Sequence, residues 1–178
     1  MADNPLFVYV ATYNNLEEAP LDYAKLDYAD VQQLYRDGVI GVYDAAIINK
    51  DIDGTVHVSK HEKPTVYGAW TGLVVGSLIA LFFPAYLIAE LALGVGTGAL
   101  IGHLWGGMSR SDMKQIGTML NSGSTALVVI GRSRLKEALT KAVKRATKQY
   151  EAELNADTKA FDKALNEAVS KMTSQASK

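Results

Sequence analysis

The spacing of hydrophobic residues before position 67 predicts a strand, a helix and then a pair of strands. Residues 6–13 are rich in β-branched and aromatic side chains, which is typical of a strand. Residues 20–38 start with proline, stop at glycine and place their apolar residues at helical spacing. In residues 41–63 two strand-like runs flank an Asp-Gly dipeptide, which favours a hairpin turn. We therefore expect a sheet with at least one covering helix.

The chain after position 108 continues this pattern with a short helix and a buried strand. Residues 109–120 carry a Ser or Asp cap and an amphipathic pattern, and residues 124–130 form an apolar run bounded by glycine. With the intervening apolar block left out, the order is βαββαβ, which predicts an α+β, ferredoxin-like domain. Its two parts would be residues 1–66 and 108–131.

From Arg132 onward the apolar residues recur mostly at steps of three and four. This period predicts a long C-terminal helical extension over residues 132–178, with a break near the cap-like Asn155. The first part, residues 132–148, is strongly basic and contains a single acid. Its modest, alanine-rich apolar face favours helix packing in self-association over contact with anionic lipid, and both over nucleic acid.

Between the two parts of the domain lies an apolar block, residues 67–107, without Lys or Arg. Pro84 divides it, since proline disfavours helix at the residue before it and fits the first turn of a new helix. We expect helices near 67–83 and 85–105, which would be roughly 25 and 30 Å long. A bilayer's hydrocarbon core is about 30 Å thick. The block therefore predicts an inserted, membrane-spanning helical hairpin with its turn at Pro84.

The glycines of this block form two rows at four-residue spacing. If the chain folds back near residue 85, the rows face each other glycine on glycine. Such contacts let two backbones approach closely, so that van der Waals packing holds the helices together within lipid. The residues predicted to pack in this glycine zipper are Gly68, Gly72, Gly76, Gly94, Gly98, Gly102 and Gly106.

Aromatic residues mark both ends of the predicted hairpin, as in the interfacial belts of membrane segments. The open end carries Tyr67, Trp70 and Trp105, and the tip carries Phe82, Phe83 and Tyr86. Basic residues flank the open end alone, which predicts that the remaining parts of the chain lie on the cytoplasmic side.

Two ionisable residues lie inside the block. Glu90 is close to the tip, where we expect it to reach the headgroups or a neighbouring subunit, with an ion path as the alternative. His103 is one turn from the open end, and we expect an interfacial or hydrogen-bonded side chain rather than a ligand.

The remaining composition offers no catalytic chemistry. The formal net charge is −1 and there is no cysteine, so no disulfide, thiolate metal site or thiol nucleophile is available. His57 and His61 would lie about 13 Å apart on a strand, too far for one metal. No triad, carboxylate pair or phosphate-binding loop is present. We expect no enzyme, no cofactor or metal site, no nucleic acid partner and no small-molecule substrate.

Three stretches occur in a familiar order: "DAAIINKDIDGTVHVSKHEK", the glycine-rich block and "NSGSTALVVIG". Together, over roughly residues 40–131, they resemble a bacterial family of unknown function. Its members are predicted membrane proteins with a glycine-rich hairpin, distantly similar to general stress proteins. The resemblance implies a membrane-associated or stress-linked role and supplies no catalytic residues.

These observations favour a non-enzymatic, membrane-associated structural protein that forms homo-oligomers in the bacterial cytoplasmic membrane. Its expected partners are further copies of itself and membrane lipid, and its role would be membrane organisation under stress. One alternative is a soluble, self-assembling particle or filament in the cytoplasm that buries its hairpins, with or without lipid. Another is a channel-like oligomer that uses Glu90.

Overall fold

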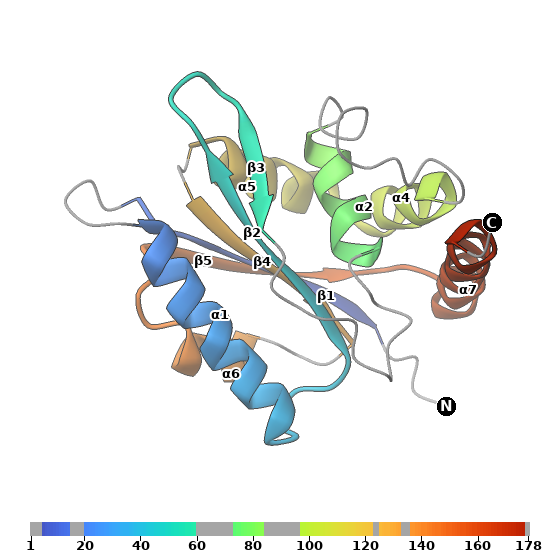
Figure 1. Ribbon diagram of the computed structural model, residues 1–178, viewed down its shortest axis with the longest axis horizontal. Coiled ribbons are helices and arrows are strands. Elements are labelled where there is room, and N and C mark those ends of the chain that lie inside the picture. Colours follow the sequence, from blue (N-terminus) through green and yellow to red (C-terminus); the bar gives the residue numbers. More distant parts are fainter. Residues whose placement is uncertain are drawn as a thin grey trace.

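The computed structural model describes residues 5–14, 20–59, 73–83, 97–122, 125–132 and 136–176. They form a five-stranded antiparallel sheet in the order β3-β2-β4-β1-β5, together with six helices within these ranges (Figure 1). The strands are β1 (Leu6–Thr12), β2 (Tyr43–Lys50), β3 (Val56–Ser59), β4 (Thr125–Gly131) and β5 (Lys148–Leu154). The helices are α1 (Pro20–Arg36), α2 (Leu73–Phe82), α4 (Thr97–Gly107), α5 (Arg110–Ser122), α6 (Lys136–Ala142) and α7 (Thr158–Ala176).

Helices cover both faces of the sheet. Helices α1 and α6 pack on one face, and α2, α4, α5 and α7 pack on the other (Figure 1). Successive residues of β1 alternate between the two cores: Val8 packs with the second group of helices, and Tyr9 packs with the first. Every residue of β1 and β4 is consequently buried, as in sheets enclosed on both sides. The predicted α+β class is confirmed.

Six elements predicted from the pattern are present near their expected bounds: β1, α1, β2, β3, α5 and β4. Gly38 follows α1 with φ 71°, and Gly54 lies in the hairpin turn with φ 88°. Both backbones are left-handed, a conformation that glycine adopts without a Cβ clash. At the start of α5, Ser109 Oγ accepts the Asp112 N–H at 3.0 Å, which makes Ser109 the cap.

The helical extension predicted after Arg132, with a break near Asn155, is confirmed beyond that break, where α7 runs from Thr158 to Ala176, and is wrong as one helix before it. Residues 148–154 form β5, which pairs with β1 from Leu6↔Leu154 to Thr12↔Lys148. The basic stretch 132–148 is therefore not one amphipathic helix, because α6 ends at Ala142. The physical reason is the open edge of β1, whose backbone N–H and C=O groups need partners and find them in β5.

The apolar block contributes α2 and α4, of 10 and 11 residues. Helix α2 ends at Phe82, two residues before Pro84, close to the predicted boundary. The predicted turn at Pro84 lies outside the described residues. Among the described ranges, no helix combines the length and the apolar character needed to cross a membrane.

Candidate functional site

Helix α4 has one face in the core and one face open to solvent. Leu100 and Leu104 are fully buried against α2 and the sheet. On the opposite side, Trp105 is 60% exposed, and Gly102 is also exposed. The helix contains no Lys, Arg, Asp or Glu. We define the α4 outer face as Gly98, Ala99, Gly102, Trp105 and Gly106, all exposed.

Four of the seven predicted packing glycines are described. Gly76 is buried within α2, whereas Gly98, Gly102 and Gly106 lie on the α4 outer face. For those three, a Cβ built on the backbone meets no heavy atom of the described chain within 4 Å. Gly68, Gly72 and Gly94 lie outside the described residues, so the glycine-on-glycine pairing stays a prediction.

Among the predicted interfacial aromatics, Phe82 and Phe83 are half-buried and pack against the core on the α2 side. Trp105 is thus the exposed member of the described three. The other three, Tyr67, Trp70 and Tyr86, lie outside the described residues. Of the two ionisable residues, His103 is half-buried in α4, and Glu90 lies outside the described residues.

A close backbone approach occurs at Gly107, which the four-residue spacing did not single out. A Cβ there would lie 3.1 Å from Ala156 Cβ, 3.2 Å from Ala156 N and 3.3 Å from its Cα. Asn155 N–H also donates to the Gly107 carbonyl at 2.7 Å. The end of α4 is therefore fastened to the connection between β5 and α7, and only glycine fits without displacement.

The start of α2 is held by a carboxylate that the sequence pattern also did not single out. Asp44 lies in β2 and is only 3% exposed, with Oδ2 accepting the Val75 N–H at 3.1 Å. This N–H belongs to the first turn of α2, whose N–H groups have no partner within the helix. A negative charge there also complements the helix dipole. The signal in the sequence was a lone acid in the apolar run "YDAAII".

On the other face of the sheet, Asp27 is fully buried in a hydrogen-bonded cluster. Tyr13 Oη donates to its Oδ2 at 2.7 Å, and the Arg145 guanidinium donates to its Oδ1 at 2.6 Å. The Arg145 backbone N–H donates to Oδ2 at 3.2 Å, and the guanidinium also reaches Asp30 at 3.0 Å. Both carboxylate oxygens are occupied, so the cluster ties α1 to the connection before β5.

The electrostatics of this cluster favour its present protonation state. Burial, followed by the hydrogen bond to Asp27, raises the pKa of Tyr13 well above its ordinary value. Burial and the charge of Asp27 likewise raise the pKa of Tyr9. The hydrogen bonds to Asp27 and Asp30 raise the pKa of Arg145. The tyrosines therefore stay neutral and Arg145 stays charged, which suits a structural tie better than a proton-transfer site.

In the described part of the chain, no three His, Cys, Asp or Glu side chains lie close enough together to bind a metal ion. His57 is exposed on the β2–β3 hairpin, and its Nε2 lies 2.8 Å from Asp51 Oδ2. His61 lies outside the described residues. The distinctive surface of the described molecule is therefore the uncharged α4 outer face.

These features define a mixed α+β protein with a doubly covered sheet and an uncharged, solvent-facing helix. Residues 65–170 match a family model described as "Protein of unknown function (DUF1269)". The match spans more than half of the chain, and the protein belongs to this family. No curated protein and no solved structure matches the chain.

The family match begins at residue 65, after the first of the three stretches on which the sequence resemblance rested, and it extends to residue 170, past the last of them. It includes β5 and most of α7, so the expectation that the likeness stops near residue 131 is wrong. The expected membership of a family of unknown function is confirmed. Membrane association and similarity to stress proteins stay predictions.

Proposed function

We propose that this protein is a non-catalytic, membrane-associated structural protein whose α4 outer face contacts the bilayer. The observation that carries the proposal is the exposure of Trp105 on a helix without Lys, Arg, Asp or Glu. Tryptophan is enriched where protein meets the membrane interface, because its ring is apolar and its N–H is polar. The resemblance to general stress proteins favours membrane organisation under stress as the setting.

The arrangement of the remaining elements supports a ferredoxin-like scaffold for this surface. Leaving out residues 51–124, the order is β1-α1-β2-β4-α6-β5, a βαββαβ unit. In the sheet, β2 and β4 are antiparallel neighbours. They would be the second and third strands of this unit. Helices α1 and α6 pack on the same face. On this interpretation the insertion that carries α2 and α4 lies between β2 and β4, and the fourth strand is β5 instead of β4.

Flotation of the purified full-length chain with phospholipid vesicles tests the proposal. We expect the protein to float with vesicles of equal parts phosphatidylcholine and phosphatidylglycerol. Replacing Trp105 with Ala should lower the partition coefficient about tenfold, since withdrawing a large apolar side chain from lipid costs about 1.5 kcal/mol or more. Leu26→Ala is the matched control, because Leu26 is 51% exposed on α1 at the opposite face of the sheet. Absence of the wild-type protein from the floating fraction would refute membrane association.

A second candidate function is homo-oligomerisation through the same face. The four-residue spacing of Gly98, Gly102 and Gly106, all exposed in described α4, offers a flat ridge against which a second helix can pack. Sedimentation velocity in lipid-free, detergent-free buffer separates the two functions. A discrete oligomer that Gly102→Leu dissociates would favour assembly, whereas a monomer that floats with vesicles would favour the membrane surface.

A further inference from the structure

Helix α7 carries a row of exposed charges at four-residue spacing. The row is Lys159, Lys163, Glu167 and Lys171, with three cations and one anion. We call it the α7 lysine ridge. Residues four apart are neighbours on a helix surface, so each side chain of the row lies next to the following one. They line an open depression on the protein surface together with Asp162, Asn166 and Ser170.

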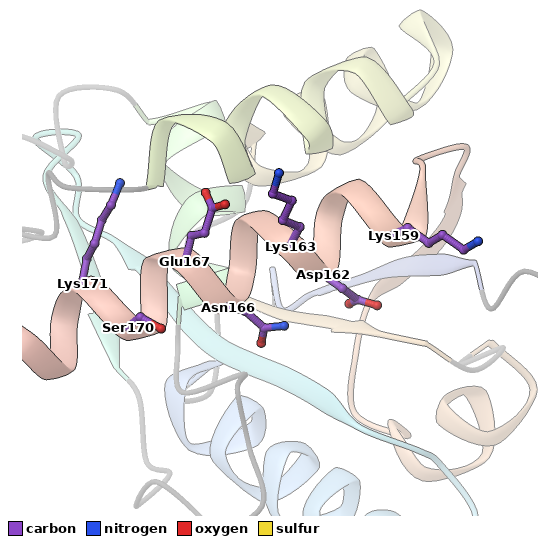
Figure 2. A pocket seen from close by; sticks show the side chains of 7 residues that line it. All are labelled: Lys159, Asp162, Lys163, Asn166, Glu167, Ser170 and Lys171. Carbon is purple, nitrogen blue, oxygen red and sulfur yellow. The ribbon is translucent and has the colours of Figure 1, made fainter.

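Two of the three cations of the row, Lys163 and Lys171, lie on the edge of α7 toward α4 (Figure 2). Figure 2 shows Lys163, Glu167 and Lys171 extending toward α4, while Asp162, Asn166 and Ser170 extend to the other side. The charged residue on that second side, Asp162, forms an ion pair with Arg132. On the edge beside α4 the helix thus presents two cations and one anion, which leaves a net positive charge.

The two helices are firmly joined. Ala164 and Ala168 of α7 are buried in the same core as Leu100 and Leu104 of α4. The hydrogen bond from Asn155 N–H to the Gly107 carbonyl connects the end of α4 to the residues just before α7. The uncharged α4 outer face and the α7 lysine ridge therefore belong to adjoining, mutually packed helices.

We infer that the α7 lysine ridge binds the headgroups of anionic phospholipids when the α4 outer face contacts a bilayer. This inference rests on the proposed membrane association and adds the class of lipid. An exposed tryptophan beside lysines is the combination used by proteins that lie on anionic membranes, where the ring enters the interface and the ammonium groups meet phosphates. Glu167 lowers the formal charge of the ridge, which leaves two net positive charges for this contact.

The test compares vesicles of pure phosphatidylcholine with vesicles of equal parts phosphatidylcholine and phosphatidylglycerol. The wild-type chain should partition more strongly into the anionic vesicles, and added salt should weaken this preference. Each lysine near an anionic surface contributes roughly a fivefold increase in partitioning. The triple variant Lys159→Gln, Lys163→Gln and Lys171→Gln should therefore lose about a hundredfold on anionic vesicles and little on neutral ones.

A matched triple variant controls for net charge. Lys25→Gln, Lys141→Gln and Lys144→Gln removes three exposed lysines from α1 and the α6 region, on the other side of the sheet. It should keep the anionic preference of the wild-type chain. Equal losses in the two triple variants would overturn the ridge as the binding site, and so would equal wild-type partitioning into both vesicle types. Partitioning into neither type would refute the proposed function itself, and self-association without vesicles would assign this surface to a second copy.

Discussion

The junction between α4 and the residues before α7 makes a sharp prediction, because two adjacent glycines there have opposite surroundings. A Cβ at Gly107 would lie 3.1–3.3 Å from three atoms of Ala156, two of them in the backbone. A Cβ at Gly106 would meet no atom of the described chain within 4 Å. Neither glycine has a positive φ, so alanine is compatible with the backbone at both positions. The variants Gly106→Ala and Gly107→Ala therefore differ in packing and little else.

Ala156 has little freedom to move away from an added methyl group. On one side, Asn155 donates to the Gly107 carbonyl at 2.7 Å, and the preceding Leu154 pairs with β1. On the other side, Asp157 caps α7 by accepting the Lys159 N–H at 3.0 Å. Overpacking of this kind costs about 1–3 kcal/mol. The gain from replacing glycine by alanine in a helix, at most about 1 kcal/mol, applies to both variants.

Urea denaturation followed by far-ultraviolet circular dichroism measures the two free energies of unfolding. We expect Gly107→Ala to be less stable than Gly106→Ala by about 1–3 kcal/mol. For a chain of this size the corresponding difference in Tm is roughly 3–9 °C. Gly106→Ala should equal or slightly exceed the wild-type chain. If Gly107→Ala matched or exceeded Gly106→Ala, the argument that Ala156 is held in place would be refuted.

Three further predictions concern the buried polar groups. Asp44→Ala removes the acceptor at the start of α2 and should lower the free energy of unfolding by about 1–3 kcal/mol in urea denaturation. Asp44→Asn should lower it less. An unchanged free energy of unfolding in Asp44→Ala would exclude the cap. Tyr13→Phe should cost about 1.5–3 kcal/mol, because the buried Asp27 carboxylate loses a hydrogen bond; a neutral effect would exclude that bond as a stabilising contact. The raised pKa values of Tyr9 and Tyr13 predict stability that is complete below pH 10 and falls above it, since the unfolded tyrosines release protons that the folded ones keep. The slope should approach about 1.4 kcal/mol per pH unit for each tyrosine, and Tyr13→Phe should be measurably less sensitive between neutral and alkaline pH than the wild-type chain.

The elements that the sequence predicted correctly are those whose signals are local. The proline at position 20 and the glycine at position 38 bound α1, and the Asp-Gly turn separates β2 from β3. Ser109 caps α5, and the N–H that its hydroxyl oxygen accepts belongs to Asp112, only three residues further along the chain. Each of these signals acts within one turn or one hairpin, so it can be recognised without knowledge of the rest of the fold.

Strand β5 shows where local signals mislead. Its sequence, "KQYEAEL", is composed mostly of good helix formers, and its apolar residues continue the helical spacing of the preceding stretch. The same residues also alternate, with Tyr150, Ala152 and Leu154 packing with one core. A stretch of seven residues is short enough to fit both the helical period and the strand period. The open edge of β1 decides between them, because its backbone N–H and C=O groups form a ladder with β5.

The candidate surface was predicted in part. The sequence singled out Trp105 and the glycines of α4 by their spacing, but it did not indicate which side of the helix faces the core. That choice depends on how α2, α4 and α7 fill the space above the sheet. The importance of Gly107, Asp44 and the α7 lysine ridge was likewise hidden, because their contacts or neighbours come from segments distant in the chain.

By itself, the sequence determined the α+β class, the bounds of α1 and of the β2–β3 hairpin, the end of α2 close to Pro84 and the uncharged character of α4. These follow from side-chain stereochemistry and polarity, which act over a few residues. The tertiary structure decided that residues 148–154 are a strand, that α2 lies enclosed against the sheet and that the α4 outer face adjoins the α7 lysine ridge. These outcomes depend on which open sheet edge and which apolar faces remain to be covered, and that is a property of the assembled chain.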